Sequence, residues 1–230
     1  MHALPHLTLT DWVSLVIYFT SWAGYAWFSE RSQRGAGGLT RTSQNYRLLW
    51  ALRMLERENR VMDSTLIGNL VTSVSFYANT TIYIIAGLVA ALGASDKLLS
   101  ITADLPFGGA GNQELLEIKL MLVLACFVFA YFKFTWSLRQ FNLLSILVGA
   151  APFGKREEAG IETYAHRLAG ANSLAGDDFN RGIRAYYFGL AASGWLLNPA
   201  ALGALAIVIL VVLYRRDYQS AALHILRDHD

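Results

Sequence analysis

The feature that most constrains the fold is a run of apolar residues from Leu120 to Trp136, in which Lys133 is the single charged residue. Other long apolar runs occur along the chain, and a helix needs about 17 to 25 mostly apolar residues to cross a bilayer. The sequence is 54% hydrophobic and 16% charged, against about 25% charged residues in an ordinary soluble domain. The long apolar runs and the low share of charged residues therefore favour an integral membrane protein over a soluble domain with a large core.

We expect an all-α polytopic membrane bundle in which five segments are apolar enough to be transmembrane helices. The expected spans are residues 11–29, 64–92, 117–137, 181–197 and 199–214. The last two could instead form one kinked span, which would give four crossings. We favour two because Asn198-Pro199 is typical of a new start: Asn is a strong N-cap, and Pro suits the first helical position. The 230 residues then form a single membrane domain.

Two polar connections have the pattern of amphipathic helices that lie on the cytoplasmic surface. The first begins near Ser43, where Leu52 and Leu55 fall on one side of a helix and Arg53 and Arg57 fall elsewhere. The second covers residues 156–178 and is expected to end before the fourth span begins.

The distribution of basic residues predicts the orientation, because Lys and Arg collect in cytoplasmic connections. They are frequent after the first span, after the third span and in the C-terminal tail, whereas the second connection contains only Lys97. Five crossings place the N-terminus outside and all basic loops and the tail in the cytoplasm. A re-entrant hairpin at the C-terminal end would also place the tail in the cytoplasm. The N-terminus lacks the features of a cleaved signal peptide, so we expect the first span to be retained.

The second span carries a polar face in a largely apolar segment. At 100° per residue, one broad face collects the polar residues Asn69, Thr72, Ser73, Asn79 and Thr80. Because polar side chains are costly in lipid and seek partners, we expect this face to look into the protein. Helix packing is the main interpretation, and a polar pathway or ligand groove is the alternative. The lack of charge on the face favours assembly over ion passage.

Four basic residues lie at the predicted cytoplasmic ends of the spans: Lys133, Arg139, Arg181 and Arg184. The Lys133 side chain is long enough to reach the headgroup region, and guanidinium groups suit phosphate. These residues are therefore candidates for contact with anionic phospholipid or with a partner. Ordinary anchoring and ion pairs with Asp177, Asp178, Glu157 or Glu158 are the alternative.

The chain contains no catalytic signature that we can recognise. Gly-x-Ser-x-Gly, a Walker loop, His-Glu-x-x-His and the dinucleotide fingerprint do not occur. None of the five histidines is central in a span, which disfavours a haem between membrane helices. One cysteine, Cys126, can form neither an internal disulfide nor a Cys-rich metal site. The net charge is only +2, so we expect no nucleic-acid partner. From the missing motifs we expect no enzyme activity, metal or cofactor.

Several segments resemble one family. FNRGIRAYYFGLAASGWLLNP at 179–199, VVLYRRDY at 211–218 and RQFNLLSILVGAAP at 139–152 are similar to the domain of unknown function 599 family of bacteria and plants. RGIRAYYF is the most specific block, and the resemblance extends over nearly the whole chain. It implies an integral membrane protein and makes the bacterial inner membrane the expected location. It brings no established activity or ligand.

Taken together, the sequence predicts a small non-enzymatic membrane protein that assembles through its polar second span. It would form a homo-oligomer or act as an accessory subunit of a larger membrane complex. A channel or transporter using the Asn/Thr/Ser face is one alternative. A protein that handles anionic lipid through its arginines is the other.

Overall fold

A computed structural model describes residues 7–35, 39–103 and 112–220, and this part of the chain is helical with no strand. The elements in chain order are α1 (Leu9–Gly35), α2 (Leu39–Leu55), α3 (Val61–Gly93), α4 (Ser95–Ala103), α5 (Gln113–Gly149), α6 (Ile161–Ser193), the 3-10 turn η1 (Gly194–Leu196) and α7 (Pro199–Tyr218). The all-α prediction is confirmed for these residues.

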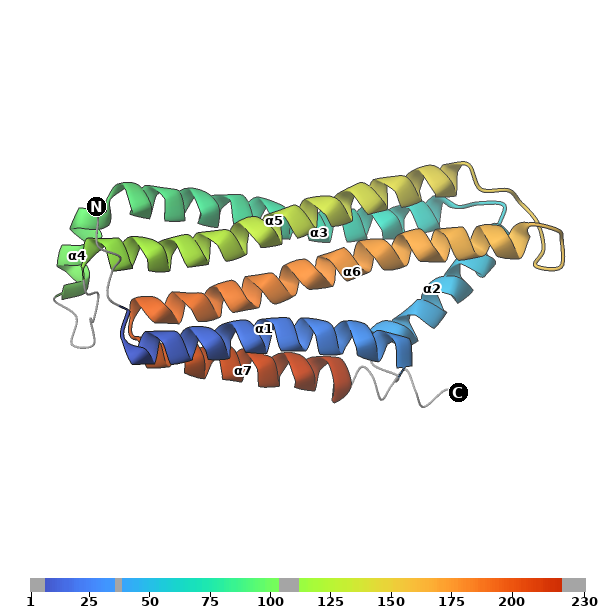
Figure 1. Ribbon diagram of the computed structural model, residues 1–230. Helices are drawn as coiled ribbons and strands as arrows, with labels where there is room; N and C mark the ends of the chain where they lie inside the picture. Colours follow the sequence, from blue (N-terminus) through green and yellow to red (C-terminus); the bar gives the residue numbers. More distant parts are fainter. Residues whose placement is uncertain (1–6, 36–38, 104–111, 221–230) are drawn as a thin grey trace.

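The long helices form an elongated bundle (Figure 1). The antiparallel helices α5 and α6 make the most extensive contact, and α3 packs on α5 at one edge. On the other side of α6, α1 and α7 run parallel to one another. Helices α3, α5 and α6 extend past the ends of α1 and α7, and α2 packs against α6 in this extension.

The predicted helix start at Asn198-Pro199 is confirmed. The Asn198 side chain accepts a hydrogen bond of 2.7 Å from the Ala201 N–H, and Pro199 is the first residue of α7. A side-chain cap satisfies an amide at a helix start, where the helix itself provides no acceptor. The chain therefore reverses between α6 and α7 through η1.

Three helices, α3, α5 and α7, are long and apolar enough to cross a membrane. They contain the predicted spans 64–92, 117–137 and 199–214, which supports the membrane class. The predicted span 11–29 lies within α1, and the predicted span 181–197 covers the end of α6, η1 and Leu197. Neither α1 nor α6 is among the three, so the number five is not confirmed.

The separate surface helix predicted for residues 156–178 is wrong, because α6 runs without a break from Ile161 to Ser193. Polar residues in this stretch suggested a solvated surface. In the structure Asn172 and Asp178 are instead buried within the bundle. The first polar connection does contain a helix, α2, in which Leu52 and Leu55 are buried. Its place on the cytoplasmic surface stays a prediction.

The basic connections gather at one end of the bundle. The α2–α3 and α5–α6 connections lie there, the C-terminal ends of α1 and α7 point toward it, and α4 lies at the opposite end (Figure 1). This arrangement agrees with the pattern expected from the charges. Which end faces the cytoplasm is a prediction.

Candidate functional site

The polar face of α3 does not look into the chain's own bundle. Thr81, which lies off that face, is buried, whereas Asn69, Thr72, Ser73 and Asn79 are exposed and Thr80 is half-buried. The expectation of an inward face is therefore wrong for a single copy. The cause is that α3 is an edge helix, and Ile67, Val74 and Ala78 supply the side that packs on α5.

The hydroxyl groups of this face are satisfied locally. Thr72, Ser73 and Thr80 each donate to the carbonyl four residues earlier in α3, at 2.9, 2.9 and 2.8 Å. Such bonds let a hydroxyl exist on an exposed helix face without an external acceptor. Recognition at this face would therefore depend most on the amides of Asn69 and Asn79.

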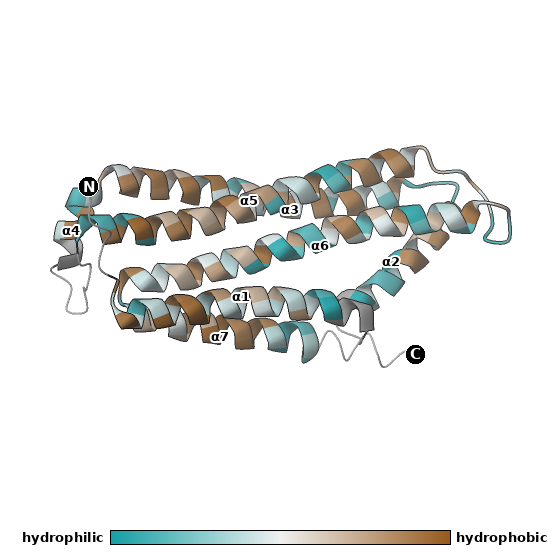
Figure 2. Ribbon diagram, viewed as in Figure 1, coloured by the Kyte–Doolittle hydropathy of each residue, from teal (hydrophilic) through white to brown (hydrophobic). Residues whose placement is uncertain are grey.

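A set of charged residues crosses the bundle at one level. It joins α1, α5, α6 and α7, and we call it the charged layer: Glu30, Lys133, Asp178, Arg181, Arg184 and Asp217. Figure 2 shows hydrophilic residues along the middle of α6 and at the ends of α1 and α7. Charged groups are expensive in hydrocarbon and sit at its boundary. The charged layer crosses the bundle partway along α5, and exposed apolar residues such as Leu143 and Ile146 continue beyond it in that helix.

The polar face of α3 straddles this layer. Tyr77 packs against Phe134, with 5.6 Å between ring centroids, and Phe134 follows Lys133 in α5. At 1.5 Å per residue, Asn69 lies about 12 Å farther along the axis than Tyr77, toward α2. Asn69, Thr72 and Ser73 thus lie on the α2 side of the charged layer, and Asn79 lies on its other side.

Ion pairs within the chain occupy two of the predicted lipid contacts. Lys133 binds Asp178 at 3.1 Å, and Arg181 binds Glu30 at 3.0 Å and Asp178 at 3.6 Å. These pairs connect α1, α5 and α6. The alternative that named Asp178 as an ion-pair partner is the one that the geometry favours.

The other two predicted lipid contacts differ from each other. Arg184 is 6% exposed and lies within electrostatic reach of Tyr25 and Asp217, where the Tyr25 hydroxyl donates to Asp217 at 2.6 Å. Its burial argues against direct contact with a headgroup. Arg139 is exposed, and its guanidinium lies 5.3 Å from the centroid of the Trp136 ring. Of the four predicted lipid contacts, it alone remains at the surface without an ion pair among the described residues.

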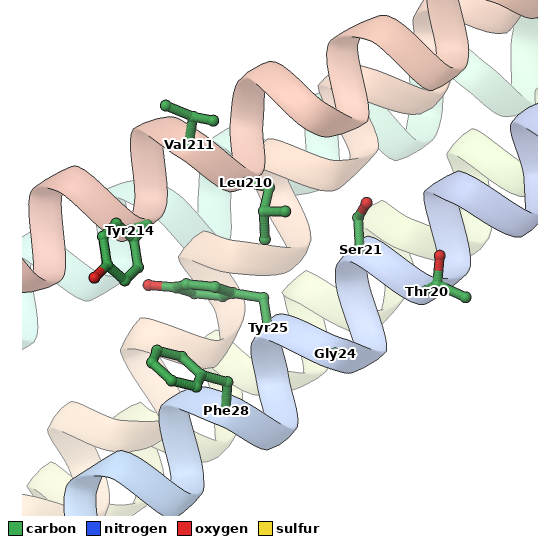
Figure 3. A pocket seen from close by; sticks show the side chains of 8 residues that line it. All are labelled: Thr20, Ser21, Gly24, Tyr25, Phe28, Leu210, Val211 and Tyr214. Carbon is green, nitrogen blue, oxygen red and sulfur yellow. The ribbon is translucent and has the colours of Figure 1, made fainter.

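An open apolar groove of about 440 Å³ lies between α1 and α7 (Figure 3). Tyr25, Phe28 and Tyr214 form its aromatic part, and Leu210 and Val211 form its aliphatic part. Such a groove on a membrane protein can hold an acyl chain. No local sequence pattern indicates this groove, because its two walls are about 190 residues apart in the chain.

A buried polar group at the opposite end of the bundle also escaped sequence reasoning. The Trp195 indole N–H donates to Asp11 at 2.7 Å, and the Lys119 ammonium lies 5.8 Å from the Trp195 ring centroid. All three side chains are almost completely buried. Their contact fastens α1, α5 and η1 together, so a structural role explains it.

Comparison with known proteins identifies the family of the chain. A protein-family model described as a protein of unknown function, DUF599, matches residues 13–222. The chain belongs to the DUF599 family. No curated protein and no solved structure matches the sequence.

Membership in the DUF599 family confirms the resemblance seen in the sequence and covers all seven helices, from α1 to α7. The RGIRAYYF block, residues 181–188, lies in α6 where that helix passes through the charged layer. Its Arg181 and Arg184 bind or face acids of α1, α6 and α7. In this DUF599 protein, the most specific block therefore holds the bundle together at the charged layer.

Proposed function

We propose that the protein is a non-enzymatic membrane component that assembles through the exposed face of α3, first of all with further copies of itself. An accessory role in a larger membrane complex is the same proposal with a different partner. The observation that carries it is the outward direction of the polar α3 face, which has no partner helix among the described residues.

The position of α3 supports an external partner. Its main neighbour in the chain is α5, and α4 adds a smaller contact. Gly68 and Gly87 have open space beside them, so a second helix could approach α3 closely there. Close approach over small residues, with amides that bond across the interface, is a common way for membrane helices to associate.

The part of α3 beyond the charged layer adds a second argument. Met62 and Leu66 are exposed there, and Phe76 is 66% exposed close to the layer. These side chains add exposed apolar area to the helix that carries the polar face. Contiguous exposed apolar surface is typical of contact sites for proteins or membranes.

Cysteine cross-linking in native membranes tests this proposal. The buried Cys126 is first replaced by Ser, and Thr72, Phe76 and Asn79 are then changed to Cys one at a time. A disulfide requires Cα atoms within about 7 Å, so a copy packed on this face gives a covalent dimer at one or more of these positions. A heteromeric partner gives a covalent product of another mass.

The matched control is Val212→Cys, at an exposed position on the outer side of α7. We expect no cross-linked product there. If none of the three α3 positions forms a product, or if Val212→Cys forms as much as they do, the proposed contact surface is wrong.

The α1–α7 groove favours lipid handling as a second candidate function. Its lining is largely apolar, and Tyr25 at its edge is bonded to Asp217 of the charged layer. A lipid could therefore place an acyl chain in the groove and its headgroup near the charged layer. A channel or transporter is less well supported, because the α3 face could line a pathway only between several copies.

A further inference from the structure

A second cavity, of about 350 Å³, lies between α2, α3, α5 and α6, on the α2 side of the charged layer. Its walls are mixed in chemistry. Its lining is Ser43, Arg47, Trp50, Leu70, Ser73, Val74, Phe141, Asn172, Gly176, Phe179 and Asn180. It shares Ser73 with the polar face of α3, but sequence reasoning assigned no site to Arg47.

The cation in this cavity lacks a partner. The Arg47 Nη1 atom is buried and makes no hydrogen bond to any described residue. The guanidinium lies against Gly176 of α6, where an added Cβ would collide with it. A glycine at this position therefore leaves the space that the guanidinium occupies.

The neighbouring Asp177 does not neutralise Arg47 by direct pairing. Burial lowers the pKa of Arg47, and the charge of Asp177 opposes that effect. The Asp177 Oδ1 atom is itself buried without a hydrogen-bond partner. Buried polar atoms are almost always bonded to protein, water or a ligand, so the empty side of Arg47 needs an acceptor.

The cavity offers more than one donor to such an acceptor. The amides of Asn172 and Asn180 and the hydroxyl of Ser43 line it together with Arg47, and Asn172 is 5% exposed. The hydroxyl proton of Ser73 is not available, because it bonds to the Asn69 carbonyl. Donors on α2 and α6 can serve several oxygens of one group, which suits phosphate better than a carboxylate with two.

The remaining walls are apolar and aromatic, with Leu70, Val74, Phe141 and Phe179 among them. A bare phosphate would leave much of the volume unfilled. A phosphate ester with an apolar substituent would place its oxygens at Arg47 and its substituent against these side chains.

From this arrangement, we propose that the cavity binds a phosphate ester, with Arg47 as the cation and Asn172, Asn180 and Ser43 as neutral donors. The ester is either the headgroup of a lipid in the adjacent leaflet or a soluble molecule. This site is independent of assembly through α3.

Titration calorimetry of the purified full chain in an uncharged detergent tests the proposal with two probes. Dihexanoyl phosphatidic acid represents a lipid headgroup, and phenyl phosphate represents a soluble ester. We expect saturable binding of at least one. Preference for phosphatidic acid identifies a lipid site, and comparable binding of phenyl phosphate identifies a site for soluble esters.

Two variants remove the cation or its place. Arg47→Gln is expected to weaken binding tenfold or more, since a charge-assisted bond to phosphate is lost. Gly176→Ala keeps the charge but displaces the guanidinium, so it should also weaken binding. Circular dichroism and size-exclusion chromatography verify that both variants fold and keep the oligomeric state of the parent protein.

The matched control is Arg53→Gln, which removes the same charge from an exposed position of the same helix. It should change affinity by less than twofold. The proposal is overturned if neither probe binds saturably, since water then serves Arg47, or if Arg53→Gln weakens binding as much as Arg47→Gln.

Discussion

At the scale of single residues, Asp63 shows how one carboxylate fixes the position of a surface helix. Its side chain is 0% exposed, and its Oδ1 atom accepts hydrogen bonds of 2.7 Å from both the Trp50 indole and the Arg57 guanidinium. Trp50 belongs to α2, and Asp63 belongs to the first turn of α3. The short connection between these helices is therefore closed by bonds to one buried oxygen.

We predict that Asp63→Ala destabilises the protein by about 1–3 kcal/mol, because it leaves a half-buried indole N–H and a guanidinium without their acceptor. The measurement is the midpoint of thermal unfolding in mild detergent. Glu58→Ala, at an exposed position in the same connection, should leave the midpoint nearly unchanged. Equal shifts for the two variants would show that the Asp63 bonds do not stabilise the fold.

At the scale of elements, the contact of α5 with α6 depends on small residues in α6. Gly182 faces Phe134, and Gly189 faces Phe127. A glycine brings a neighbouring helix close, at a cost of helix stability in its own segment. The aromatic rings of α5 occupy the space that side chains at these two positions would fill, so α5 and α6 pack closely there.

The variant Gly182→Ala tests this close approach. Its Cβ would lie 2.5 Å from the Phe134 ring, and such overpacking should destabilise the protein by about 1–3 kcal/mol. Gly170→Ala, in the same helix, meets no atom within 4 Å and should be neutral or stabilising by up to about 1 kcal/mol. Thermal unfolding of both variants measures the difference, and a Gly182→Ala protein as stable as Gly170→Ala would contradict the packing account.

At the scale of the whole molecule, the sequence predicted the helical class and the start of α7, because both depend on local chemistry. Apolar runs indicate helices that can lie in lipid, and Asn198-Pro199 indicates an N-cap followed by the first residue of a helix. The direction of the α3 face could not be predicted in the same way. Periodicity shows that Asn69 and Asn79 share a side, but only the placement of α5 decides whether that side is inside or outside.

The same limit explains what the sequence missed at the candidate sites. Asn172 and Asp178 resemble the surface residues of a polar helix until α2 and α5 are placed against them. Arg47 is one of seven arginines in a basic connection, and nothing in the local sequence distinguishes it from Arg53. Its cavity is built by α2, α3, α5 and α6 together, so tertiary packing alone separates the buried guanidinium from the exposed one.

The central claim is that the exposed α3 face is covered by another protein chain, and the mass of the intact particle tests it most directly. Native mass spectrometry of the protein extracted in mild detergent should give a multiple of the 25.5 kDa chain mass, or that mass together with a partner subunit. A particle that contains one 25.5 kDa chain and no other protein would contradict the claim.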